Sequence, residues 1–202
     1  MTVSTRPYHH GNLKETVLSL AFDAVEQAGH ETLSIRDIAA AAGVTPMAIY
    51  RHFSNRTSLL AAVAGMAFRQ LYESHVRVVR NCATPWEKLD KTMRVFITFV
   101  DRHPNLFRLM FDPSVASPEE FQHEFYWQQK AYDSILGLFV EAQPDLDQKA
   151  IRLRQLSMWS SLFGYATART TGTLKHYMLE GVSRKEIVDS IVRTAIGPRA
   201  QA

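Results

Sequence analysis

The chain has 202 residues, of which 46% are hydrophobic, and a formal net charge of +3 at pH 7, so it can bury a core and its charge permits nucleic-acid binding without requiring it. Its apolar stretches are interrupted well before the roughly 18 consecutive residues that a membrane span needs, so we expect no such span and a cytoplasmic location. The single cysteine, Cys82, excludes an intrachain disulfide, and we expect no metal site and no cofactor.

The first third of the chain predicts three short helices. Apolar residues recur at spacings of three and four from Leu13 onward, and Gly29 follows where a left-handed residue commonly ends a helix. Ser34 is the expected N-cap of a second helix that ends at Gly43, because glycine adopts a positive φ without a Cβ clash. Thr45 can cap a third helix with Pro46 at its first position. This spacing predicts a helix-turn-helix.

The remaining chain also shows helical spacing without sustained alternation, which predicts an all-α protein of about nine or ten helices. Prolines mark several boundaries, and Ser183 with Glu186 predicts a capping box for the last helix. We expect longer helices over about 57–82, 85–102, 119–140, 146–170 and 183–196, a short helix after Pro104, and a loop between Pro113 and Pro118. We divide the chain into a domain of residues 1–56, with the linking helix to about 71, and a helical domain of residues 57–202.

The third helix carries polar and small side chains on its outward faces. If Val44, Ile49 and Phe53 are buried, the residues that project outward are Thr45, Met47, Ala48, Tyr50, Arg51 and His52. Threonine and alanine side chains can contact a thymine methyl group. The side chains that can donate hydrogen bonds to phosphate oxygens are those of Tyr50, Arg51, His52 and the nearby Arg56. Arg36 can reach a phosphate or a guanine edge. Alternatively, Tyr50 and Phe53 are core aromatics and the arginines form a solvated face.

Residues from about Tyr8 to Leu71 resemble the tetracycline-repressor (TetR/AcrR) family of transcriptional regulators. The segment "LSIRDIAAAAGVTPMAIYRHFSNRTSLLAAV" is similar to the family pattern of Ile-Ala, Ala-Gly-Val and Tyr-x-His-Phe followed by a basic residue and Leu-Leu. The resemblance implies an N-terminal three-helix DNA-binding domain joined to a C-terminal domain for ligand binding and dimerisation. Our DNA-binding set is His10, Ser34, Arg36, Thr45, Met47, Ala48, Tyr50, Arg51, His52 and Arg56, with phosphate roles implied for His10, Tyr50, His52 and Arg56 and base-facing roles for Thr45, Met47 and Ala48.

The C-terminal half is similar to a subgroup of that family named for a Trp-x3-His-Gly element. "HPNLFRLMF" matches the subgroup, but in "WSSLFG" Phe163 replaces the histidine, between Trp159 and Gly164. A ligand role implied for that histidine therefore does not transfer to this chain.

Aromatic residues concentrate between residues 93 and 139, and one helical stripe reads Phe121, Phe125, Gln128, Tyr132, Ile135 and Phe139. A buried Gln128 needs a hydrogen-bond partner, because an unpaired amide costs about 1–3 kcal/mol. We expect either a ligand cavity or a plainly packed aromatic core. The predicted ligand-binding residues are Phe96, Phe99, His103, Phe107, Met110, Phe125, Gln128, Tyr132, Trp159 and Phe163.

Small residues form a stripe on the helix from about Leu146, where two helix backbones can approach closely. A second copy of the chain, or an intrachain helix, would fill this groove. The predicted dimer-interface residues are Ser157, Ser161, Gly164, Ala168, Val188, Ile191 and Ala195.

The sequence lacks the nucleophile-elbow, phosphate-loop, dinucleotide and zinc-protease motifs, so we expect no catalytic activity. The hypothesis is a homodimeric repressor that binds double-stranded, palindromic operator DNA and is released by a small, largely apolar effector. Two alternatives remain: a helical enzyme or carrier that uses the aromatic cavity, and a DNA-binding regulator without a ligand.

Overall fold

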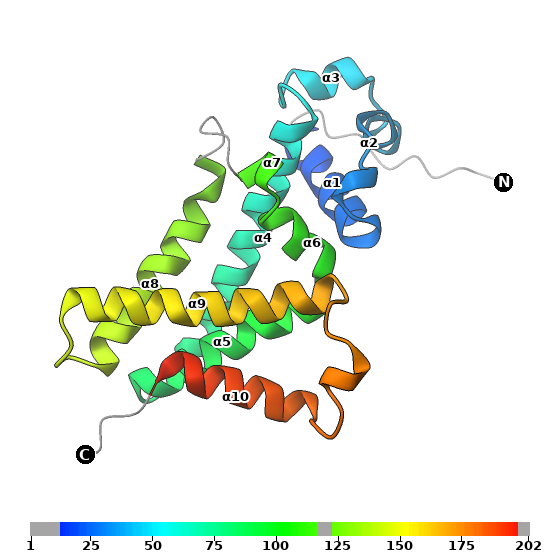
Figure 1. Cartoon of the computed structure of the whole chain (residues 1–202). Helices are drawn as coiled ribbons and strands as arrows, with labels where there is room; N and C mark the ends of the chain where they lie inside the picture. The colour runs from blue at the N-terminus through cyan, green and yellow to red at the C-terminus, as the bar shows by residue number, and fades with distance from the viewer. Residues whose placement is uncertain (1–12, 117–122, 198–202) are drawn as a thin grey trace.

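The structure is a computed structural model that describes residues 13–116 and 123–197, and this part of the chain is built from α-helices and short 3-10 turns (Figure 1). The expectation of an all-α protein with about ten helices is confirmed. The elements are α1 (Leu13–Ala28), η1 (His30–Thr32), α2 (Ile35–Ala42), α3 (Pro46–Tyr50), α4 (Arg56–Val79), α5 (Pro85–Arg102), α6 (Pro104–Met110), α7 (Pro113–Ala116), α8 (Tyr126–Ala142), α9 (Gln148–Thr170), η3 (His176–Met178) and α10 (Arg184–Ile196). None of the described helices is long and apolar enough to cross a membrane.

The turn between α2 and α3 has the local chemistry that the sequence predicts. The Ser34 hydroxyl accepts a hydrogen bond from the backbone N–H of Asp37, and Gly43 is left-handed with φ 69° and ψ 30°. Pro46 occupies the first turn of α3, but the Thr45 side chain makes no capping hydrogen bond. The backbone N–H of Val44 instead donates to the carbonyl of Ala39 at 2.9 Å, which closes the turn.

Helix α4 joins the two halves of the molecule. Its N-cap is Asn55, whose side chain accepts from the backbone N–H of Ser58 in a reciprocal capping box. The helix therefore begins at Arg56 and ends at Val79, three residues before the predicted end at Cys82. With 24 residues it spans about 36 Å at 1.5 Å per residue, long enough to cross both halves (Figure 1).

Two apolar cores lie along α4. The first contains buried residues of α1 to α4 together with Phe99, Leu106, Leu109 and Met110 of α5 and α6. The second is formed by α5, α8, α9 and α10, with Phe139 fully buried at its centre. Helix α6 thus packs into the first core, although it follows the predicted domain boundary at residue 56 in the chain.

Some local predictions were wrong. Gly29 has the positive φ of 86° that glycine favours, but its ψ of 158° lies outside the left-handed helical region that was predicted, and the chain continues into η1. Residues 113–116 form the short helix α7 where a loop was predicted. Helix α8 begins at Tyr126 and not near Glu119, because residues 123–125 form a 3-10 turn that lies against α4.

Candidate functional site

The outward face of α3 is exposed, while its inward face is packed. Ile49 is fully buried and Phe53 is 4% exposed, whereas Met47 and Tyr50 are 67% and 45% exposed. Thr45, Arg51 and His52 are exposed as well, and so is Arg36 on α2, while Ser34 and Ala48 are half-buried. The helix-turn-helix therefore presents the predicted set at the surface. Their roles toward DNA stay a prediction, and His10 lies outside the described residues.

Arg56 lies in a different environment from the rest of the predicted DNA-binding set. Its Nε–H donates to the carbonyl oxygen of Leu33 at 2.9 Å, and its Nη2 group donates to the carbonyls of Glu31, at 3.1 Å, and His30. These bonds tie the start of α4 to η1 and the segment before α2. The Nε and Nη2 groups of Arg56 are thereby used inside the protein, and its implied phosphate role stays a prediction for the Nη1 group.

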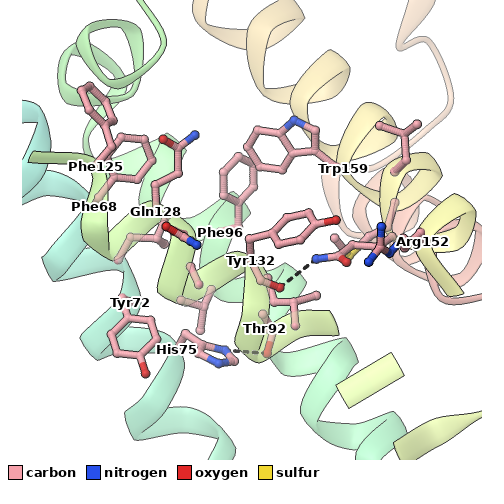
Figure 2. A pocket seen from close by; sticks show the side chains of 18 of the residues that line it. Phe68, Tyr72, His75, Thr92, Phe96, Phe125, Gln128, Tyr132, Arg152 and Trp159 are labelled. Carbon is pink, nitrogen blue, oxygen red and sulfur yellow. Dashed lines mark hydrogen bonds between the residues drawn. The ribbon is translucent and has the colours of Figure 1, made fainter. Parts of the chain in front are cut away.

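A cavity of about 990 Å³ lies between α4, α5, α8 and α9 (Figure 2). One region of its wall is aromatic: Phe68 and Phe125 meet edge to face with ring centroids 5.6 Å apart, and Phe96 and Trp159 do so at 5.5 Å. Leu71, Val95, Phe111, Ala131, Ile135 and Met158 complete the apolar lining. A volume of this size lies at the upper end of the range of pockets that hold small molecules.

The cavity brings together only part of the predicted ligand-binding set. Phe96, Phe125, Gln128, Tyr132 and Trp159 line it. Gln128 is exposed, so the predicted cost of burying its amide does not arise. Tyr132 is 50% exposed, which places it at the open side of the cavity.

The other predicted ligand residues do not line the cavity. Phe107 and Phe163 contact each other in the second core, with ring centroids 5.8 Å apart and ring planes tilted by 51°. Phe99 and Met110 belong to the first core, and His103 pairs with Glu26 of α1. The part of α5 that lines the cavity ends at Phe96, so the predicted residues Phe99 and His103 lie beyond it.

A histidine that the sequence analysis missed lies in the cavity wall. His75 of α4 is 4% exposed and hydrogen-bonds through Nδ1 to Thr92 Oγ1 and through Nε2 to Ser134 Oγ, both at 2.9 Å. Thr92 donates its own hydroxyl proton to the carbonyl of Lys88 at 2.7 Å, so it accepts from Nδ1–H, and Nε2 accepts from Ser134. Burial lowers the pKa of His75, which favours this neutral tautomer. Its position seven residues after Phe68, on the same face of α4, could have revealed it.

Gln155 of α9 also lines the cavity, and it too was missed. The side chain is 2% exposed, and its Nε2 donates to the backbone carbonyl of Tyr132 at 2.8 Å (Figure 2). Its Oε1 has no hydrogen-bond partner among the described residues. The helices α4, α5 and α9 thus contribute the buried polar side chains of His75, Thr92 and Gln155 to the cavity wall.

Polar contacts also join the two cores. His103 Nδ1 is hydrogen-bonded to the Glu26 carboxylate, and the Asn105 side-chain amide donates to the Glu26 backbone carbonyl at 2.9 Å. His30 Nε2 lies 2.8 Å from Asp112 Oδ2. The Ser114 hydroxyl, and to a lesser degree His30, lower the pKa of Asp112. The end of α5, with α6 and the start of α7, is therefore bound to α1 and η1.

The predicted dimer-interface set is divided between surface and core. Ser157 and Gly164 of α9 are exposed, Ser161, Ala168 and Ile191 are half-buried, and a Cβ added to Gly164 would meet open space. Val188 and Ala195 are buried in the second core, so they are not available to a second copy. The described part of the chain leaves the α9 face around Ser157 and Gly164 uncovered.

Comparisons with known proteins agree with this architecture. Residues 17–63 match the family model described as bacterial regulatory proteins of the tetR family, and residues 89–195 match the tetracyclin repressor-like C-terminal domain. The HTH-type transcriptional repressor KstR of Mycobacterium tuberculosis is 24% identical over 191 residues, which cover 94% of this chain and 83% of that repressor.

Solved structures share the fold over nearly the whole chain. A protein of unknown function from Rhodococcus sp. RHA1 has a TM-score of 0.78 and 26% identity, and the match covers 95% of this chain and 97% of that one. The transcriptional regulator FadR of Bacillus subtilis, solved in complex with stearoyl-CoA, has a TM-score of 0.68 and 19% identity, with 91% and 97% of the two chains covered. Of these proteins, KstR is named as a transcriptional repressor and FadR as a transcriptional regulator.

Proposed function

Because this chain belongs to the tetR family of bacterial regulatory proteins, we propose that it is a DNA-binding transcriptional repressor that a small, largely apolar effector releases from a palindromic operator. The observation that carries the proposal is the pairing of an outward-facing helix-turn-helix with a cavity of about 990 Å³ along the same α4 helix. Repressors such as KstR among the relatives support the sign of regulation.

The recognition surface is the exposed side of α3. Met47 and Tyr50 are large side chains that the protein itself leaves uncovered, although Ile49 between them is fully buried. We assign base contacts to Thr45, Met47 and Ala48, and phosphate contacts to Tyr50, Arg51 and His52. Arg36 and Ser34, at the start of α2, complete the surface. His10 is kept as a phosphate contact of the N-terminal segment.

The effector acts through linkage. A ligand that binds better to the conformation with wrongly spaced recognition helices weakens DNA binding by that difference in affinity, and reversing a 99:1 preference needs about 5.5 kcal/mol. The cavity borders α4 and α5, and α5 continues into α6, which His103 and Asn105 attach to Glu26 of α1. A shift of α4 or α5 around a ligand therefore reaches the DNA-binding helices directly.

A homodimer suits this mechanism, because two-fold proteins bind half-sites about 34–36 Å apart. The uncovered α9 face at Ser157 and Gly164 is our proposed contact between the two copies, with Ser161, Ala168 and Ile191 at its margin. We also propose that the protein acts in the cytoplasm, where its operator would be.

The test is selection of bound fragments from a pool of genomic DNA, followed by affinity measurements across a salt series. Tyr50→Ala and Arg36→Ala should each lose most of the selective binding, while Tyr177→Ala, which removes a 74% exposed tyrosine of η3, should bind like the wild type. Each phosphate contact adds about 0.9 to the slope of log affinity against log salt. Equal binding by Tyr50→Ala and the wild type would contradict the assignment of α3 and favour an enzyme or carrier that uses the cavity.

The regulator without a ligand makes a different prediction. If no compound that enters the cavity changes operator affinity, the protein regulates constitutively and the cavity is only a packing defect. FadR in complex with stearoyl-CoA, a protein of the same fold, supports the ligand-responsive alternative.

A further inference from the structure

The cavity is chemically polarised from one end to the other. Phe68 and Phe125 lie on the side of α4 and the start of α8, and Arg152 of α9 lies on the opposite side (Figure 2). Lys149, one helical turn before Arg152, and Gln148 line the same end. An amphiphile would match this distribution better than a compact apolar molecule, because its two ends differ as the two ends of the cavity do.

The two cations at this end have no counter-ion in the described part of the protein. Lys149 and Arg152 are exposed, and neither takes part in an ion pair or side-chain hydrogen bond there. Arg169 on the same helix is different, since it lies 2.8 Å from Asp101. Asp147, the nearest acidic residue of α9, accepts from the backbone N–H of Ala150 as the N-cap.

The wall of the cavity contains no balancing negative charge. Among the described residues that line it there is no aspartate and no glutamate. His75 is held neutral by its hydrogen bonds to Thr92 and Ser134 and by burial, which lowers its pKa. The electrostatic field in the cavity therefore comes from Lys149 and Arg152, and it favours an anion at the α9 end.

A buried amide lies next to the two cations. Gln155, one turn after Arg152, is 2% exposed, and its Nε2 donates to the backbone carbonyl of Tyr132 at 2.8 Å. Its Oε1 is fully covered and has no hydrogen-bond partner among the described residues, so a ligand in the cavity does not reach it. Lys149 and Arg152 are therefore the groups of this end that an anionic ligand can contact.

We infer that the effector of the proposed repressor is an amphiphile with a terminal oxyanion, a carboxylate or a phosphate, that binds Lys149 and Arg152 while its apolar chain lies against Phe96, Phe125 and Trp159. The inference rests on the proposed function only in treating this ligand as an effector, because binding of the ligand can be measured without DNA.

The test compares probes of one chain length by calorimetry on the full chain, below their micellar concentrations. Dodecanoate and dodecyl phosphate should bind at least about tenfold more tightly than dodecanol, and dodecyltrimethylammonium should bind most weakly. The tighter of the two anions identifies the head group. Raising the salt concentration should weaken the two anions and leave dodecanol unchanged.

Variants locate the anion. Arg152→Gln and Lys149→Gln should each weaken dodecanoate about threefold to tenfold and leave dodecanol within about twofold. Arg102→Gln is the matched control, because Arg102 is an exposed arginine of α5 that does not line the cavity. The inference would be overturned if dodecanoate and dodecanol bound equally tightly or if neither anion bound. It would also be overturned if the Arg152→Gln variant bound dodecanoate like the wild type.

Operator binding by the same samples separates this inference from the proposed function. Tight, Arg152-dependent binding of dodecanoate by a protein that selects no DNA would contradict the repressor and leave the anion site in place. If dodecanol and dodecanoate bind with equal affinity and both release DNA, the result would support the repressor and contradict the anion site.

Discussion

The hydrogen-bonded chain Lys88–Thr92–His75–Ser134 should contribute measurably to the stability of the C-terminal half. The perturbation is Thr92→Val, which keeps the shape of the side chain and removes the oxygen that accepts from His75 Nδ1–H at 2.9 Å. Thr92 is 5% exposed and His75 is 4% exposed, so water cannot readily replace the lost acceptor on this side.

The expected magnitude follows from leaving a buried donor without a partner. That costs about 1–3 kcal/mol, because the N–H keeps its desolvation penalty and gains nothing in return. His75 can escape part of the cost by moving its proton to Nε2, but Ser134 must then turn its hydroxyl from donor to acceptor. We therefore expect Thr92→Val to destabilise the protein by about 1–2 kcal/mol.

Urea unfolding at pH 7.5 measures this change, with helicity as the signal. Thr98→Val is the matched control: it makes the same substitution in the same helix at an exposed position, so it should change stability by no more than about 0.5 kcal/mol. If Thr92→Val is as stable as Thr98→Val, the buried network contributes nothing and the assigned tautomer is wrong.

Three further predictions concern single positions. Because burial lowers the pKa of His75, the unfolded chain binds a proton at this residue more readily than the folded one, so the free energy of unfolding should fall by up to about 1.4 kcal/mol per pH unit below about pH 6.5. Unfolding of His75→Gln at several pH values should show a shallower dependence of stability on pH. An unchanged slope would assign the effect to other groups. Gly65→Ala would place a Cβ 2.6 Å from the backbone oxygen of Glu124. It should therefore destabilise the protein by about 1–3 kcal/mol in thermal unfolding, despite the better helix propensity of alanine. A stabilised variant would show that the turn before α8 moves away from α4 at little cost. Gly43→Ala should lower the free energy of unfolding by about 1–2 kcal/mol, because Gly43 has a φ of 69°. Gly137→Ala lies in helix α8 with open space around the added Cβ, so it should raise the free energy of unfolding by roughly 0.5–1 kcal/mol. Effects of equal sign in thermal unfolding would refute the conformational explanation.

Most features that depend on neighbours in the sequence were predicted correctly, although the Thr45 cap and the left-handed Gly29 were not. The Ser34 cap, the left-handed Gly43 and the Ser183–Glu186 capping box are confirmed, because each involves residues within three or four positions of one another. The buried Ile49 beside exposed Met47 follows from the 100° step between successive helical residues.

Features that depend on how helices cross were predicted poorly. Phe96 and Phe99 both belong to the apolar side of α5, yet Phe96 faces the cavity and Phe99 packs with α1 to α4. Ile97 and Val100 belong to the second core with Phe96, so the two cores meet on opposite sides of this turn of α5. The contacts of Arg56 with the carbonyl oxygens of His30, Glu31 and Leu33 were likewise not predicted, because these residues lie more than twenty positions away in the chain.

The sequence by itself therefore determined the helical class, the position of the turn between α2 and α3, and the side chains that α3 turns outward. Only the tertiary structure decided that His75, Thr92 and Gln155 meet around one cavity and that Arg152 closes its far end. The physical reason is that periodicity assigns each residue to a face of its own helix, whereas the partner of that face depends on contacts between residues that lie far apart in the chain.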